Sequence, residues 1–232
     1  MQTTQGRLIT LIAAAGISFP TYAEGPMATD DAGTLDIGGM KVEVVLGRDD
    51  KTRSAELGFG FGLIENVEIG LGFARETDRT ADPSAKLRGT GIGIKWVPIQ
   101  NDTGWSLGMS FGYGKTRVDD RFNAEKFTER EYALTGLASY RLENNQVLHL
   151  NLGAVRVKAQ GESDTVRTWN IGYEFPLVEN LQLTVETYGA EHSRPDKAIG
   201  LRYEVFDGFK VSAAVGRGND RGFGQVGLAW EF

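Results

Sequence analysis

The side chains that could do chemistry in this chain are charged groups and one histidine at alternate positions of extended segments. Acids and bases occur together in this set, which comprises Lys41, Glu43, Glu56, Glu68, Lys95, Arg141, His149, Glu186, Arg202, Glu204, Lys210 and Glu231. Successive side chains of a strand point to opposite faces, so these residues share a face with glycine, serine and threonine. We expect them to line a lumen. Mixed charges leave two alternatives open: a polar path for a solute, or an interior sealed by paired charges.

Catalytic, metal-binding and nucleotide-binding motifs are not recognisable. The two histidines, His149 and His192, lie in no motif that pairs a nucleophile with a base. Cysteine is absent, which excludes disulfides and Cys-based zinc or redox sites. Residues 58–62 alternate glycine with phenylalanine, but no helix pattern follows, so they are not a phosphate-binding loop. We therefore predict no enzyme, no cofactor and no metal.

The strand that ends the chain shows the underlying pattern most clearly. Val226, Leu228, Trp230 and Phe232 alternate with small or polar residues. Aromatic residues of this kind form girdles at the lipid boundary of transmembrane barrels. A terminal Phe after an alternating strand also resembles the signal by which bacterial outer-membrane barrels are recognised for assembly. We therefore assign Trp230 and Phe232 to that signal, with the barrel-assembly machinery as partner.

The same alternation recurs through residues 40–232 and predicts about twelve strands of roughly ten residues, long enough for a tilted strand to span a bilayer. Short turns alternate with polar links, which we expect at residues 48–53, 75–85, 119–126, 160–163, 192–195 and 219–221. Outer-membrane barrels have tight periplasmic turns and more elaborate external loops. An even number of strands places both termini on the periplasmic side.

One face of the pattern carries nearly all the large apolar residues, while the other carries glycine, serine, threonine and charges. In lipid, unpaired backbone groups at an open sheet edge are too costly, so the strands must close. We predict an all-β, closed antiparallel transmembrane β-barrel; the alternative is a soluble ligand-binding barrel of the lipocalin type. A net charge of −6 without basic clusters argues against nucleic-acid binding. Charges in the links at 48–53 and 117–121 suit contact with outer-membrane lipid and lipopolysaccharide.

Residues 1–39 precede the first strand and divide into two parts. Arg7, an apolar run from Leu8 to Phe19 and a small residue at Ala23 predict a signal peptide over residues 1–23, and hence export to the bacterial outer membrane. Residues 24–39 have no regular period and form an irregular segment that could plug the lumen through Thr29, Asp30 and Asp31. For Asp30 and Asp31 we favour a solvated or hydrogen-bonded pair over a cation site.

The segment Pro26-Met-Ala-Thr-Asp-Asp-Ala-Gly-Thr34 resembles the opening of a family of outer-membrane transporters labelled for the meta-cleavage pathway of phenol degradation ("MetA-pathway"). The resemblance covers Pro26, Thr29, Asp30, Asp31, Ala32, Gly33 and Thr34. It implies a passive outer-membrane channel for a small solute such as an aromatic or other hydrophobic compound. A sealed structural or adhesive barrel that binds a partner through its external loops is the alternative, and a membrane enzyme is the third hypothesis.

Overall fold

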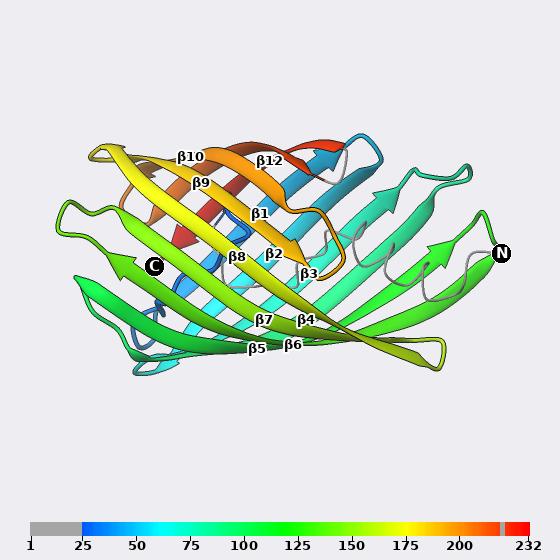
Figure 1. Cartoon of the computed structure of the whole chain (residues 1–232), viewed down its shortest axis with the longest axis horizontal. Coiled ribbons are helices and arrows are strands. Elements are labelled where there is room, and N and C mark those ends of the chain that lie inside the picture. Colours follow the sequence, from blue (N-terminus) through cyan, green and yellow to red (C-terminus); the bar gives the residue numbers. More distant parts are fainter. Residues whose placement is uncertain (1–24, 219–220) are drawn as a thin grey trace.

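Twelve strands form one closed antiparallel barrel in the computed structural model of the chain, which describes residues 25–218 and 221–232 (Figure 1). The strands are β1 (Met40–Asp49), β2 (Thr52–Ile64), β3 (Val67–Asp78), β4 (Ala85–Ile99), β5 (Gly104–Asp120), β6 (Glu125–Arg141), β7 (Val147–Ala159), β8 (Glu162–Val178), β9 (Leu181–Ala190), β10 (Asp196–Phe206), β11 (Phe209–Gly218) and β12 (Arg221–Glu231). The predicted fold class and strand number are confirmed. The predicted signal peptide, residues 1–23, lies outside the described residues.

The strands are longer than the sequence predicted, and β5, β6 and β8 each contain 17 residues. Much of the sequence expected in polar links belongs to strands: β3 continues to Asp78, β5 to Asp120, and β6 begins at Glu125. The expectation of elaborate external loops is wrong in these hairpins. The two-residue rhythm persists there, but its outward positions change from apolar to charged, as at Arg75, while Glu76 points inward and is buried.

The barrel closes between its first and last strands. Their register runs from Lys41 opposite Glu231 to Asp49 opposite Phe223, and Met40 and Phe232 exchange two backbone hydrogen bonds of 2.8 and 2.9 Å. The ring centroids of Trp230 and Phe232 lie 4.8 Å apart beside this seam. Closure leaves no unpaired sheet edge.

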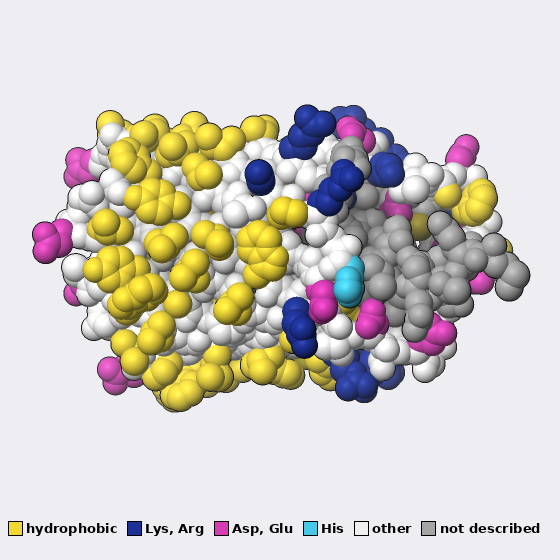
Figure 2. All heavy atoms as spheres, viewed as in Figure 1, with side chains coloured by type: hydrophobic (Ala, Val, Ile, Leu, Met, Phe, Trp, Pro, Cys, Tyr) yellow, Lys and Arg dark blue, Asp and Glu magenta, His cyan; other side chains and the backbone are white. Residues whose placement is uncertain are grey.

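Apolar side chains cover the outside of the barrel. Every strand exposes at least one large apolar residue, for example Val44, Phe59, Leu71, Ile92, Trp105, Leu134, Leu152, Ile171, Val185, Ile199, Val215 and Val226. Figure 2 shows these side chains gathered around one part of the barrel, with Lys and Arg bordering them toward the opposite end. In the part of the chain described, no helix has the length and apolar character needed to cross a membrane.

Candidate lumen site

The irregular segment of residues 25–39, hereafter the inner segment, follows the inside of the wall (dark blue in Figure 1). Its hydrogen-bond partners come in turn from around the barrel: Glu43 of β1 and Arg202 of β10, then Glu186 of β9, Asn170 of β8, Asn151 of β7, Ser139 of β6, Glu68 of β3 and Gly62 of β2. Side chains of so many strands can meet one segment only if it lies within the lumen. Thr29, Asp30 and Asp31, predicted as plug residues, are part of it.

Lys95 of β4 holds the middle of the inner segment by charge. Its Nζ lies 2.9 Å from Asp30 Oδ1 and 3.0 Å from Asp31 Oδ1, and Lys95 is only 1% exposed. Burial raises the pKa of Asp30 to about 6, although Lys95 opposes this shift. Burial also acts to raise the pKa of Asp31, but that carboxylate is half exposed, and its pairing with Lys95 prevails and lowers the pKa to about 2. Lys95 therefore keeps the Asp31 carboxylate ionised, whereas the Asp30 carboxylate takes up a proton near pH 6.

Glu186 and Asn151 bind the backbone of the inner segment. Glu186 accepts hydrogen bonds from the backbone N–H groups of Ala28 and Thr29, at 2.9 and 3.0 Å, and from the Thr29 hydroxyl at 2.8 Å. Asn151 accepts from the Asp30 N–H and donates to the Asp30 carbonyl, both at 2.8 Å. An irregular segment inside a protein needs such partners because its backbone groups have no neighbouring strand. Wall side chains here supply what a sheet would otherwise provide.

Ser139, His149 and Glu174 form a chain of contacts beneath the inner segment. Ser139 Oγ lies 2.8 Å from His149 Nδ1, and His149 Nε2 lies 3.8 Å from Glu174 Oε1, which also pairs with Arg202 at 2.7 Å. The Ser139 hydroxyl accepts the backbone N–H of Ala32 at 2.8 Å, and Ser139 and His149 are both buried. A hydrolase would need its nucleophile beside the substrate. This serine instead faces the inner segment, and the arrangement gives no positive indication of catalysis.

Glycines make room for the inner segment on the wall. A Cβ at Gly62 would overlap the carbonyl of Asp36, and one at Gly172 would overlap Met27. A Cβ at Gly58, two residues along β2 from Gly60, would meet nothing closer than 3.9 Å. The glycine-rich wall inferred from the sequence therefore serves two purposes: some glycines admit the segment, and others border open space.

Two cavities lie on either side of the inner segment. The hairpin-side cavity, of about 490 Å³, reaches the ends of β1 and β2 at Asp49 and Thr52. The turn-side cavity, of about 570 Å³, reaches the turn at residues 179–180 and the terminal Phe232. Gly25, Met27, Ala28 and Asp30 face the first, while Asp31, Gly33, Thr34, Leu35 and Asp36 face the second. The inner segment therefore forms a partition.

The predicted lumen residues divide between these spaces. The turn-side cavity is lined by Lys41, Glu68, Lys95, Arg141, His149, Arg202, Glu204, Lys210 and Glu231, and the hairpin-side cavity by Glu43 and Glu56. Glu186 is buried against the inner segment. Both signs of charge thus meet around the turn-side cavity, as the sequence suggested for the lumen as a whole.

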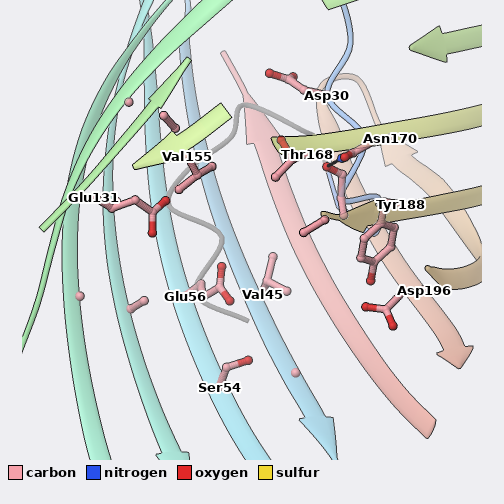
Figure 3. Close-up of a pocket in the computed structure, with 18 of the residues that line it drawn as sticks. Asp30, Val45, Ser54, Glu56, Glu131, Val155, Thr168, Asn170, Tyr188 and Asp196 are labelled. Carbon is pink, nitrogen blue, oxygen red and sulfur yellow. Dashed lines mark hydrogen bonds between the residues drawn. The ribbon is translucent and has the colours of Figure 1, made fainter. Parts of the chain in front are cut away.

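Sequence reasoning missed a second group of inward residues in the hairpin-side cavity. It includes Glu76 and Glu129. It also includes Glu131, Tyr188 and Asp196, which are labelled in Figure 3. The signal was present, because the alternation continues into the expected link at residues 75–85, which contains Glu76, and past the predicted ends of the other strands to the remaining four residues. Among residues 25–218 and 221–232, no group of three or more His, Asp or Glu side chains is placed to hold a metal ion.

The arrangement resembles that of solved outer-membrane barrels. The chain matches a KdgM porin in complex with disordered oligogalacturonate with a TM-score of 0.64 and 12% identity, over 83% of this chain and 99% of the porin. It matches the COG4313 outer-membrane channel from Pseudomonas putida F1 with a TM-score of 0.63 and 9% identity, over 89% and 100% of the two chains. The outer-membrane phospholipase A of Escherichia coli matches with a TM-score of 0.51 and 10% identity, over 89% and 93%.

Likeness at these identities shows the fold alone. No curated protein matches the chain. A family model described as "Uncharacterised conserved protein UCP029691" matches residues 11–226, and the chain belongs to that family.

Proposed function

We propose that this chain is a passive channel of the bacterial outer membrane, through which small solutes cross past the inner segment. The observation that carries the proposal is the pair of cavities separated by a partition that is held mainly by side chains of the wall, with backbone pairing to β2 only at Gly38 and Gly39. Such a partition can move while the wall remains intact. The porin and channel likenesses support the same role.

The proposed orientation places the short turns and Phe232 in the periplasm and the longer hairpins outside the cell. Residues 1–23 are then a signal peptide that is removed after Ala23, and Trp230 and Phe232 address the barrel to its assembly machinery. The apolar band borders the lipid, and the Lys and Arg beyond it meet lipopolysaccharide. The charged side chains at the hairpin ends are then in contact with water and phosphate groups, which solvate them.

Planar-bilayer recording of the mature chain tests the channel directly. We expect small or brief conductance steps from the intact chain, and larger and longer ones after deletion of residues 25–36, because deletion joins the two cavities. The intact mature chain, recorded in the same bilayers, is the control. A deleted variant that forms the barrel but passes no ions would overturn the proposal.

A sealed structural or adhesive barrel is the second candidate. Ion pairs that link the wall to itself or to the inner segment favour it, including Lys95–Asp30 at 2.9 Å and Arg221–Asp49 at 2.6 Å. The bilayer experiment separates the two candidates, because a sealed barrel stays silent. The resemblance at residues 26–34 supports an aromatic or other hydrophobic compound as the solute. The rate at which phenol enters vesicles that contain the protein would test this.

A further inference from the structure

The hairpin-side cavity collects carboxylates from several strands. Glu56 of β2, Glu76 of β3, and Glu129 and Glu131 of β6 all line it. In Figure 3 the side chains of Glu56 and Glu131 reach into the cavity from different strands. None of the four takes part in holding the inner segment.

Two of these carboxylates have an oxygen without a partner in the described part of the chain. Glu76 is 4% exposed and Glu129 is 8% exposed, and Oε1 of each is buried without a hydrogen bond. A buried carboxylate oxygen left in this state is costly, because it has lost water without gaining a donor. A ligand that donates hydrogen bonds would remove this cost.

The charges near these carboxylates mostly repel them. Glu43 acts on Glu56, Glu129 acts on Glu131, and Asp49 and Asp78 act on Glu76. The guanidinium that also acts on Glu76, that of Arg221, pairs with Asp49 at 2.6 Å. The full lining of the cavity contains nine Asp and Glu side chains and three arginines, Arg48, Arg194 and Arg221, so acidic groups outnumber basic ones and a cation is favoured over an anion.

Apolar side chains alternate with the carboxylates. Val45 lies directly across from Glu56 in the β1–β2 register, and Val157 lies directly across from Glu131 in the β6–β7 register. The carboxylates do not converge on a point where a metal ion could sit. This spacing suits a molecule with separated positive groups joined by methylene chains.

We infer that the hairpin-side cavity binds elongated organic cations of the diamine and polyamine class, with ammonium groups at the carboxylates and alkyl segments against the valines. The volume of about 490 Å³ is within the range of small-molecule sites. This inference rests on the proposed channel function, and for the solute it favours organic cations over the aromatic compounds that the resemblance at residues 26–34 implies.

Isothermal titration of the detergent-solubilised mature chain with spermidine and with 1,4-diaminobutane tests the site. We expect saturable binding that weakens with added salt, while 1,4-butanediol and phenol do not compete. The double variant Glu76→Gln/Glu129→Gln should bind spermidine about tenfold or more weakly. The matched control, Glu65→Gln/Glu143→Gln, changes the same charge at exposed turn residues and should bind as the parent does.

Three outcomes would overturn the inference: equal affinity for spermidine and butanediol, equal affinity of the two double variants, or displacement of spermidine by an equal concentration of Mg²⁺. Bilayer recording separates this failure from that of the channel. Current without spermidine binding overturns the cation site and leaves the channel. Binding without current overturns the channel.

Discussion

Lys95 brings one positive charge against the two carboxylates of the inner segment, and it is buried almost completely. Lys95→Met keeps the length of the side chain but leaves both carboxylates without their cation. Breaking a buried pair in this way costs about 3 to 5 kcal/mol. We expect the inner segment to leave the wall, with faster proteolysis of residues 25–36 and more frequent channel opening.

Lys126→Met provides the comparison. Lys126 is 79% exposed and lies 3.7 Å from Asp119, so its loss should change neither proteolysis nor conductance. A Lys95→Met chain as resistant to protease as the Lys126→Met chain would show that the cluster does not hold the segment.

The raised pKa of Asp30 predicts that mild acid favours the closed arrangement. The bound carboxyl titrates at about 6 against an ordinary 3.8, so the docked segment binds more protons between these values and becomes more stable as the pH falls. The lowered pKa of Asp31, about 2, gives a stabilisation that is fully present above 3.8 and constant in this window.

From pH 7.5 to 5 we expect the open fraction to fall about tenfold. The factor is about ten because pH 5 lies one unit below the raised pKa of Asp30, and each unit changes the equilibrium tenfold. Asp30→Asn should abolish this response in bilayer recordings. An opening that increases with acid would contradict the assignment.

At the scale of the strand, β2 offers a matched test of whether the inner segment needs a bare wall. Gly62→Ala places a methyl group on the carbonyl of Asp36, whereas Gly58→Ala meets nothing closer than 3.9 Å. We expect the first variant to release the segment and raise the conductance, and the second to match the parent. Equal conductance of the two variants would mean that the segment is not seated against β2.

Neighbouring strands also bring like charges together on the outer surface. Arg88 of β4 lies directly across from Arg75 of β3 and from Arg117 of β5, and all three are exposed. Like charges in this position are destabilising unless an anion lies between them. The phosphates of lipopolysaccharide, a partner that we propose, would relieve the repulsion within this row of arginines.

Arg88→Gln should therefore have opposite effects in two membranes. In phosphatidylcholine we expect stabilisation by about 0.2–1 kcal/mol, because repulsion is relieved. In vesicles that contain lipopolysaccharide, we expect the lipid to stabilise the Arg88→Gln variant less than it stabilises the parent. Urea unfolding measures both, with Arg121→Gln in the β5–β6 connection as the charge-matched control; a parallel change of the two variants would exclude the row as a phosphate site.

Across the whole molecule, the two-residue rhythm was enough to predict the closed barrel and its strand number, because each strand carries the apolar and polar faces within itself. It failed at residues such as Glu76 and Glu129, where a charged outward face disguised a continuing strand. The contacts of the inner segment could not be predicted, because they join residues such as Ala32 and Ser139, which are 107 apart in sequence. No local pattern records such a pairing.

Closure itself predicts behaviour in a detergent gel. A barrel joined by β1 and β12 should run faster unheated than after boiling, because its strands stay paired until heat separates them. Deletion of residues 25–36 should preserve this difference, since the inner segment adds no strand. Loss of the difference on deletion would show that the inner segment is required for closure.

The contacts of the inner segment with strands all around the wall determine when it can fold during biogenesis. Its partners reach from Glu43 to Gln225, which donates to the carbonyl of Pro26 across a separation of 199 residues. Those partners surround a common lumen only after the barrel has closed. The inner segment, although it is synthesised before every strand, is therefore the last part to reach its final position. We therefore expect a newly assembled molecule to pass through a stage in which its lumen is not yet blocked by the inner segment.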